Sequence, residues 1–228
     1  MAKERRPKSG NLDERAPTES QRRFQSMLQR YSLGADAAAR EPLETAIWKE
    51  YGTQRVVLAV DMSGFSRLTQ KHGIVHYLAL VLRMRETAKP IIEAHGGALV
   101  RFEADNAFAM FEDGLEAIRA AIELNNAFDR ENIATAQELD IHIACGIDQG
   151  EILVVESYLE FWGNAVNRAS KLGEDLAAPG EILIEREVAD ALPPARDFNI
   201  KPVRVAISGI EIDGYTVEYS RNEPAVRV

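Results

Sequence analysis

The stretch VRFEADNAFAMF, Val100 to Phe111, has the pattern of a β-hairpin. Arg101, Glu103 and Asp105 alternate with apolar residues in its first half. Side chains at every second position of a strand share a face, so these three charges line one side of it. The chain then turns at Asp105-Asn106 and returns through apolar residues. A solvated outer face is the simpler explanation, and a functional face needs support from elsewhere in the sequence.

The composition excludes several classes of function. The chain has 228 residues, of which 46% are hydrophobic and 28% charged, enough for one sizeable core with a tail. A net charge of −9 disfavours nucleic acid as a partner, because a polyanion would be repelled. Cys145 is the single cysteine, so no internal disulfide can form, and we expect a cytoplasmic protein. No stretch approaches the roughly 20 apolar residues of a membrane helix, so we expect no membrane partner.

The sequence predicts three parts. Residues 1–17 are polar and basic without an apolar period, which predicts a disordered tail. Residues 18–51 predict an N-terminal helical extension, in which Thr18 and Gln21 have capping-box spacing ahead of an amphipathic helix. The apolar face of that helix needs a partner, either the main domain or a second subunit. Residues 52–228 form the main domain.

Strands and helices alternate through the main domain, and hairpins are present. We expect, in order, a central strand over residues 55–60, a helix ending near 95 with a kink or junction at Pro90, the hairpin 99–111, a helix over 115–128, two strands around 148–150, a helix over 163–176, a strand over 181–184 and two final strands. This pattern predicts an α+β fold with a mostly antiparallel sheet flanked by helices.

Two acidic residues end predicted sheet elements. Asp61 closes the apolar strand in VVLAVDMSGFSRL and leads at once through Gly64 into a helix. A carboxylate at a strand end can coordinate a divalent cation, and amides at a following helix start can receive phosphate, although Asp-x-x-Gly is also a common way to leave a strand. Asp105 lies at the hairpin tip. Together the two carboxylates would give oxygen ligands of the kind that Mg²⁺ accepts alongside substrate phosphates.

A third segment, LEFWGNAVNRASKLG, places Asn167 and Lys171 four residues apart on a predicted helix. Residues at this spacing project from one helical face. Solvated polar pairs at this spacing are ordinary, so the segment carries weight only in combination with the other two.

Taken together, the three segments resemble the class III nucleotidyl cyclases. The matching stretches are DMSGFS, RFEADNAFAMF and EFWGNAVNRASK, in the family's order, and the resemblance covers roughly Val56 to Ile184. It implies a catalytic domain with a ferredoxin-like core, a nucleoside triphosphate substrate and a head-to-tail homodimer with active sites at the subunit interface. It also implies two Mg²⁺ or Mn²⁺ ions, held by Asp61 and Asp105 of one subunit with the Met62 carbonyl assisting.

The resemblance assigns roles to the remaining matched residues. The backbone amides around Gly64, Phe65 and Ser66 would meet the triphosphate. Asn167 from the other subunit would orient the ribose. Lys171 occupies the position of a charge-stabilising arginine, and it keeps the charge but loses the fork that bridges two phosphate oxygens. We therefore expect activity, at a reduced rate.

The chain departs from the family pattern elsewhere. Ala104 replaces the glycine before the second metal aspartate, and Ser208 replaces a lysine that meets the terminal phosphates, for which Arg204 is a candidate substitute. These departures leave open a rival hypothesis, a catalytically inactive cyclase fold that serves as a nucleotide-binding module. Retention of both metal carboxylates and Asn167 weighs against it.

In the class III cyclases two positions touch the base, and Arg101 and Glu160 occupy these positions in this chain. The two residues match neither the pair typical of adenylyl cyclases nor the pair typical of guanylyl cyclases. Both are longer than the residues of the adenylyl pair, which narrows the pocket and favours a one-ring pyrimidine, UTP or CTP. The short chain also resembles the bacterial pyrimidine cyclases of Pycsar-type antiphage defence. The alternatives are an adenylyl cyclase that makes cyclic AMP, or a pairing of Arg101 with Glu160 that leaves base choice to other residues.

Overall fold

The computed structural model describes residues 17–155, 160–207 and 210–221. The chain divides into two compact units, one reaching to Lys49 and the other beginning at Glu50, close to the domain boundary that the sequence predicts. The predicted disordered tail lies outside the described residues, apart from Pro17.

The first unit contains helices α1 (Glu19–Ser32) and α2 (Ala37–Tyr51). Thr18 caps α1 in a reciprocal capping box with Gln21, as predicted. On the predicted apolar face of α1, Phe24 and Met27 are buried.

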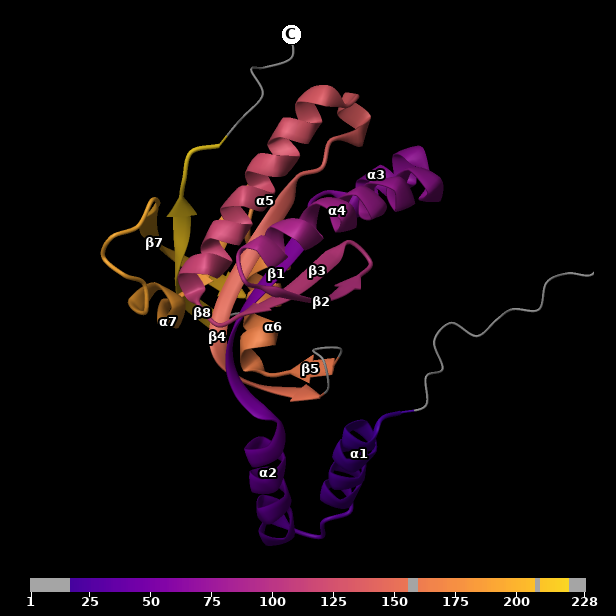
Figure 1. The fold of residues 1–228 in the computed structure, drawn as a ribbon, viewed down its shortest axis with the longest axis vertical. Helices are drawn as coiled ribbons and strands as arrows, with labels where there is room; N and C mark the ends of the chain where they lie inside the picture. The colour runs from indigo at the N-terminus through magenta and orange to yellow at the C-terminus, as the bar shows by residue number, and fades with distance from the viewer. Residues whose placement is uncertain (1–16, 156–159, 208–209, 222–228) are drawn as a thin grey trace, which may run out of the picture. The chain divides into compact units, whose positions relative to one another are not determined.

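The second unit is built on one mixed sheet (Figure 1). Its strands are β1 (Gly52–Met62), β2 (Ala98–Glu103), β3 (Asn106–Phe111), β4 (Ile143–Val155), β5 (Glu160–Trp162), β6 (Ile182–Glu185), β7 (Asn199–Ile207) and β8 (Ile210–Glu218). The order across the sheet is β2-β3-β1-β4-β6-β8-β7, with β5 paired to β4. Among the described pairings, β4 with β6 is parallel and the others are antiparallel. The predicted α+β fold is confirmed.

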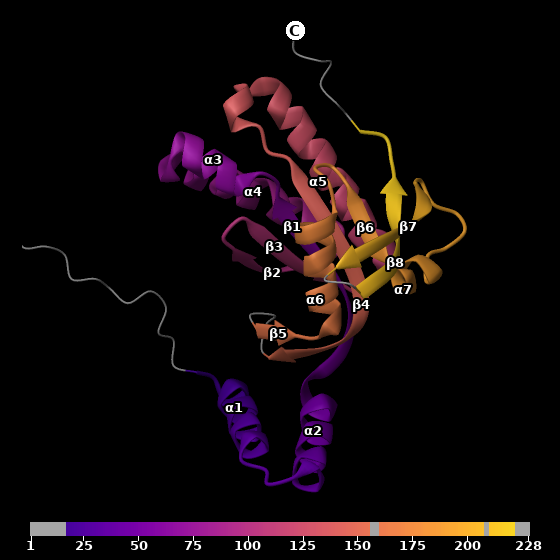
Figure 2. The same ribbon diagram turned by 180° about the vertical axis from the view of Figure 1, so that it is seen from behind.

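Helices cover both faces of this sheet (Figure 2). They are α4 (Ile74–Ala94), α5 (Gly114–Ala134) and α7 (Arg186–Asp190) on one face and α6 (Asn164–Lys171) on the other, while α3 (Phe65–His72) lies beside α4. The segment from β1 through α4, β2, β3 and α5 to β4 has the spatial strand order β4-β1-β3-β2, which is the ferredoxin-like arrangement. The larger core packs α4 and α5 on one face, and the smaller core packs α6 on the other.

Strand β1 is apolar throughout its centre because both of its faces are covered. Val56, Leu58 and Val60 pack in the core with α4 and α5, whereas Val57 and Ala59 pack in the core with α6. Alternation along the strand therefore places Asp61, at its end, on the α6 face.

The two strands predicted around Asp148-Gln149-Gly150 are instead one long strand, β4. The ladder to β1 continues without interruption, with Asp148 opposite Val57 and Gly150 opposite Arg55. Asp148 is fully buried, and its carboxylate accepts a hydrogen bond from Arg168 Nε on α6 at 2.7 Å. Burial raises the pKa of Asp148 to about 6, although the arginine acts in the opposite direction. The turn prediction was wrong because the half-exposed Arg168, which is distant in the sequence, pairs with the buried Asp148 and keeps this turn-type residue inside a strand.

Helix α4 continues through Pro90, so the predicted junction does not occur. Pro90 is exposed, whereas Ala88 and Ile92 on either side of it are fully buried, and their packing holds the helix together across the missing hydrogen bond. The helix ends at Ala94, close to the expected position. Gly96 follows it with a left-handed φ of 72° and donates its amide to the Glu93 carbonyl.

The hairpin turns at Ala104-Asp105, one residue earlier than predicted, and Glu103 pairs with Asn106. Ala104 has a φ of 54°, the left-handed conformation in which a side chain is strained. The glycine of the family pattern at this position therefore has a physical basis.

Replacing Ala104 with glycine should stabilise the protein. Relief of the left-handed strain, about 1–2 kcal/mol, exceeds the extra chain entropy that glycine loses on folding, about 0.5–1 kcal/mol. We expect the melting temperature of Ala104→Gly to rise by about 1–4 °C in calorimetry. Ala107→Gly, in buried β3 at ordinary backbone angles, is the matched control and should lower it. A lower melting temperature for Ala104→Gly would contradict the strain.

Candidate active site

The two predicted metal carboxylates lie at the same end of the sheet. Asp61 is opposite Asn106 in the β1–β3 ladder, and the next residue, Met62, donates its amide to the Asp105 carbonyl at 3.2 Å. Burial raises the pKa of Asp61 to about 7, and the negative charges of Asp105, Glu174 and Asp175 add to the shift. Burial also raises the pKa of Asp105.

The shift of Asp61 reflects a cluster of negative charge, and no cationic side chain of the described residues is among its causes. Like charges at close range disfavour ionisation, and a divalent cation removes that penalty. The donor set of Asp61, Asp105 and the Met62 carbonyl is made of oxygen atoms, which suits Mg²⁺ or Mn²⁺. The residues present therefore fit the predicted pair of ions, whose binding remains a prediction.

The strand-to-helix connection follows the predicted pattern. Gly64 has a φ of 82° and precedes α3, and the Ser63 amide donates to the His142 carbonyl at 2.8 Å. Phe65 and Ser66 begin α3, so their amides belong to its first turn, while their side chains lie outside the described residues. The phosphate role of this turn stays a prediction.

A second group of predicted residues gathers in a hollow of about 410 Å³ between the hairpin and α6. Arg101 and Phe108 line it from the hairpin, and Asn167 and Ser170 line it from α6. Asp61, Asp105 and Lys171 are not among the lining residues, although Lys171 is exposed on the same helix. Asn106 and Glu174 also line this hollow, and Asn106 lies opposite Asp61 in the β1–β3 ladder. Within one chain the hollow therefore borders on the carboxylates.

The guanidinium of Arg101 is held between two aromatic rings. Its Cζ lies 5.4 Å from the ring centroid of Phe108 and 4.9 Å from that of Phe161, on β5. It also forms an ion pair with Glu103 at 3.0 Å. Glu160 starts β5, next to Phe161, but its side chain lies outside the described residues, so its predicted contact with the base and its alternative pairing with Arg101 both stay predictions.

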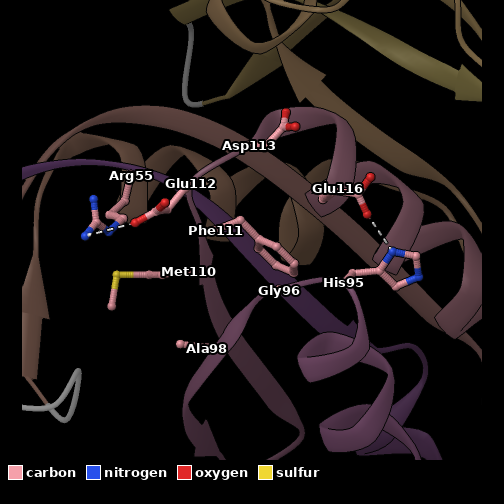
Figure 3. Close-up of a pocket in the computed structure, with 9 residues that line it drawn as sticks. All are labelled: Arg55, His95, Gly96, Ala98, Met110, Phe111, Glu112, Asp113 and Glu116. Carbon is pink, nitrogen blue, oxygen red and sulfur yellow. Dashed lines mark hydrogen bonds and ion pairs between the residues drawn. The ribbon is translucent and has the colours of Figure 1, made fainter.

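Another hollow, of about 320 Å³, lies at the opposite end of the β1–β3 ladder (Figure 3). Arg55 and His95 line it together with Glu112, Asp113 and Glu116. It contains none of the predicted site residues.

His95 closes one side of this second hollow. Its ring nitrogens bond to Glu116 at 2.9 Å and to Glu123 at 2.8 Å. Burial alone would lower the pKa of His95, but the two carboxylates outweigh it and raise that pKa. His95 therefore serves to tie the end of α4 to α5.

No family model matches the chain. Among solved structures, an adenylate/guanylate cyclase/hydrolase from Silicibacter pomeroyi is 25% identical with a TM-score of 0.61, covering 73% of this chain and 97% of that one. The adenylyl cyclase CyaB from P. aeruginosa is 20% identical with a TM-score of 0.60, covering 76% and 99%. The chain has the fold of a class III nucleotidyl cyclase catalytic domain.

Curated relatives with this similarity are longer proteins. Putative adenylate cyclase 3 of Rhizobium meliloti (strain 1021) is 28% identical over 128 residues, 56% of this chain and 21% of that protein. An uncharacterized protein of Mycobacterium tuberculosis is 29% identical over 133 residues, 58% of this chain and 33% of that protein. The chain therefore spans a third or less of the length of these relatives.

Within the class III cyclase fold, Arg204 does not join the carboxylates. It lies on β7, at the far edge of the sheet from the hairpin, where it pairs with Asp213 at 3.7 Å. Ser208, which occupies the position of the family lysine that Arg204 was a candidate to substitute, lies outside the described residues. Among the helices that the structure describes, none combines the length and hydropathy that crossing a bilayer requires.

The sequence interpretation missed Asn106 and Glu174. Glu174 lies on a π-helical turn, Leu172–Leu176, that continues α6, and its carboxylate accepts a hydrogen bond from Asn106 Nδ2 at 3.0 Å. The acidic pair Glu174-Asp175 was a visible signal, but only the π-helical turn directs these charges toward Asp61.

Proposed function

We propose that this chain is a nucleotidyl cyclase that converts a nucleoside triphosphate into a 3′,5′-cyclic nucleotide and pyrophosphate. The observation that supports this most strongly is the pairing of two half-buried carboxylates, Asp61 and Asp105, at the end of β1 in a class III cyclase fold. We further propose a head-to-tail homodimer, in which each active site takes the carboxylates of one protomer and the Arg101–Asn167 hollow of the other.

In the reaction, the ribose 3′-oxygen would attack the α-phosphorus and pass its proton to solvent water, while the bond from the α-phosphorus to the oxygen that bridges to the β-phosphate breaks and releases pyrophosphate. Two divalent cations, held by Asp61, Asp105 and the Met62 carbonyl, would lower the pKa of the 3′-hydroxyl and neutralise charge on the phosphates. Asn167 of the partner subunit would hydrogen-bond the ribose and hold its 3′-oxygen in line. Lys171 would stabilise charge on the α-phosphate, and the first turn of α3 would receive the terminal phosphates.

We propose that the substrate carries a pyrimidine base, as UTP or CTP do, and that the cyclic product serves in antiphage signalling. The support for the base is the wall formed by Arg101, which Phe108 and Phe161 hold from two sides. A guanidinium fixed in this way donates hydrogen bonds to a base carbonyl but leaves little room for a second ring. Glu160 would accept a hydrogen bond from uracil N3–H or from the cytosine amino group. A buried hydrogen-bonding group left without a partner costs about 1–3 kcal/mol, which is enough to discriminate between bases.

The decisive assay offers each of the four nucleoside triphosphates with Mn²⁺ and resolves the products by chromatography. A cyclic pyrimidine nucleotide as main product supports the proposal. Cyclic AMP as main product would support the adenylyl alternative, which the name of the Rhizobium relative favours. If none of the four substrates gives a cyclic product, the result would support the alternative of a nucleotide-binding module without cyclase activity.

Shortening both base-contacting residues should move the base preference. In the double variant Arg101→Lys with Glu160→Asp the pocket widens, so we expect the rate with ATP relative to UTP or CTP to rise about tenfold, equivalent to about 1.4 kcal/mol. Relative rates in competition between substrates measure this directly. Glu103→Asp, which alters the ion pair of Arg101 without shortening Arg101, is the control. Unchanged relative rates would remove the size argument for a pyrimidine.

A further inference from the structure

Asn106 presents an acceptor that the chain itself does not satisfy. It lies opposite Asp61 in the β1–β3 ladder, and residues paired in this way have side chains on the same face of a sheet. Its Oδ1 is buried and has no hydrogen-bond partner among the described residues. Buried polar atoms are nearly always hydrogen-bonded, so an orphan acceptor beside two carboxylates calls for a ligand.

Glu174 fixes the orientation of this amide. Because Nδ2 of Asn106 donates to Glu174 Oε1 at 3.0 Å, the oxygen must be the atom left over. Ser170 also donates its hydroxyl to Glu174, which holds the carboxylate in place. The turn that carries Glu174 packs closely on the sheet, since a Cβ added at Gly173 would lie 3.0 Å from the Gly146 amide nitrogen.

We propose that Asn106 Oδ1 is a further oxygen ligand of the divalent-cation site at Asp61 and Asp105, and that Glu174 is the residue that positions it. The inference rests on the proposed function only in taking the two carboxylates as cation ligands. Within the described part of the chain, no three His, Cys, Asp or Glu side chains are arranged to hold a metal. Two carboxylates fall short of the six oxygens that Mg²⁺ takes, and a neutral amide adds a ligand without adding repulsion.

The test measures binding of Mn²⁺ alone, without nucleotide, from the loss of the electron paramagnetic resonance signal of free Mn²⁺. We expect Asn106→Leu to bind Mn²⁺ about tenfold more weakly than the unmodified protein, and Asn106→Ala to agree with it, with melting curves confirming that both variants fold. Wild-type affinity in both variants would overturn the assignment.

Glu174 is tested by how its loss combines with the loss of Asn106. Glu174→Ala should also weaken Mn²⁺ binding by about tenfold, and the double variant Asn106→Leu with Glu174→Ala should bind no more weakly than Asn106→Leu alone, because Glu174 acts through the amide. Glu174→Gln retains an acceptor for Nδ2 and should stay within about threefold of the unmodified protein. Multiplied losses in the double variant would mean that Glu174 acts by charge and would overturn its positioning role.

Asp175→Asn is the matched control. Asp175 also raises the pKa of Asp61 through its charge, but no hydrogen bond to Asn106 is described for it. We expect less than a twofold change in Mn²⁺ affinity. Because no turnover is measured, a protein that binds Mn²⁺ through Asn106 yet makes no cyclic nucleotide would refute the proposed function and leave this inference standing.

Discussion

Asp61→Ala should lower the rate of cyclic nucleotide formation by about 10²–10³-fold, while leaving the fold and the proposed dimer intact. The carboxylate would hold cations that stabilise charge developing on the phosphates, and removal of one such preorganised stabiliser typically costs 10²–10³-fold. Turnover of the four substrates with Mn²⁺ gives the rate, and light scattering coupled to size exclusion gives the mass.

The same variant makes an opposite prediction for stability. Burial and the neighbouring carboxylates raise the pKa of Asp61 to about 7, so its ionised form is disfavoured in the protein without cations. Removing this carboxylate should therefore leave the melting temperature unchanged or raise it, as is common where function and stability conflict. Asp190→Ala, at the exposed end of α7, is the control and should keep full activity. An unfolded or monomeric Asp61→Ala protein would mean that Asp61 is structural.

Mixing two inactive variants should restore activity. In the proposed head-to-tail dimer, Asp61→Ala and Asn167→Ala would each disable both sites, because every site would take one residue from each protomer. A mixed dimer has one site that carries both defects and one site that carries neither. With random reassociation of equal amounts, half of the dimers are mixed and have one working site of two, so we expect about a quarter of the unmodified activity.

The control for this experiment mixes Asp61→Ala with Asp105→Ala. These two residues lie in the same half of the site, so every site in the mixed dimer lacks one carboxylate, and no activity should return. Recovery in the control, or none when Asp61→Ala is mixed with Asn167→Ala, would contradict the division of the site between protomers. Asn167 is exposed on α6, so its truncation should not disturb the core.

Local patterns were sufficient for the elements that form the framework of the site. The apolar run of β1 predicted a strand covered on both faces, and its polar end at Asp61 follows directly. Alternation in the hairpin and the i, i+4 spacing of Asn167 and Lys171 placed these residues on the correct elements. Such patterns succeed because the periods of strand and helix are set by backbone geometry alone.

Contacts between distant segments decided the rest. Asp148 is a residue type typical of turns, yet its ion pair with Arg168, twenty positions away, keeps it buried inside β4. Phe161 reads as an ordinary apolar residue, yet it flanks Arg101 from a strand far along the chain. Neither partner has a local signature, because burial and pairing depend on which segments the fold brings together.

By itself, then, the sequence determined the α+β class, the strand that ends in Asp61, the hairpin that carries Asp105 and the helix that carries Asn167. Only the tertiary structure placed Asn106 opposite Asp61 and turned Glu174 toward both through a π-helical continuation of α6. The physical reason is that the hydrophobic period is written in neighbouring residues. The electrostatics of the site, by contrast, arise from side chains that become neighbours only when the sheet and its helices pack.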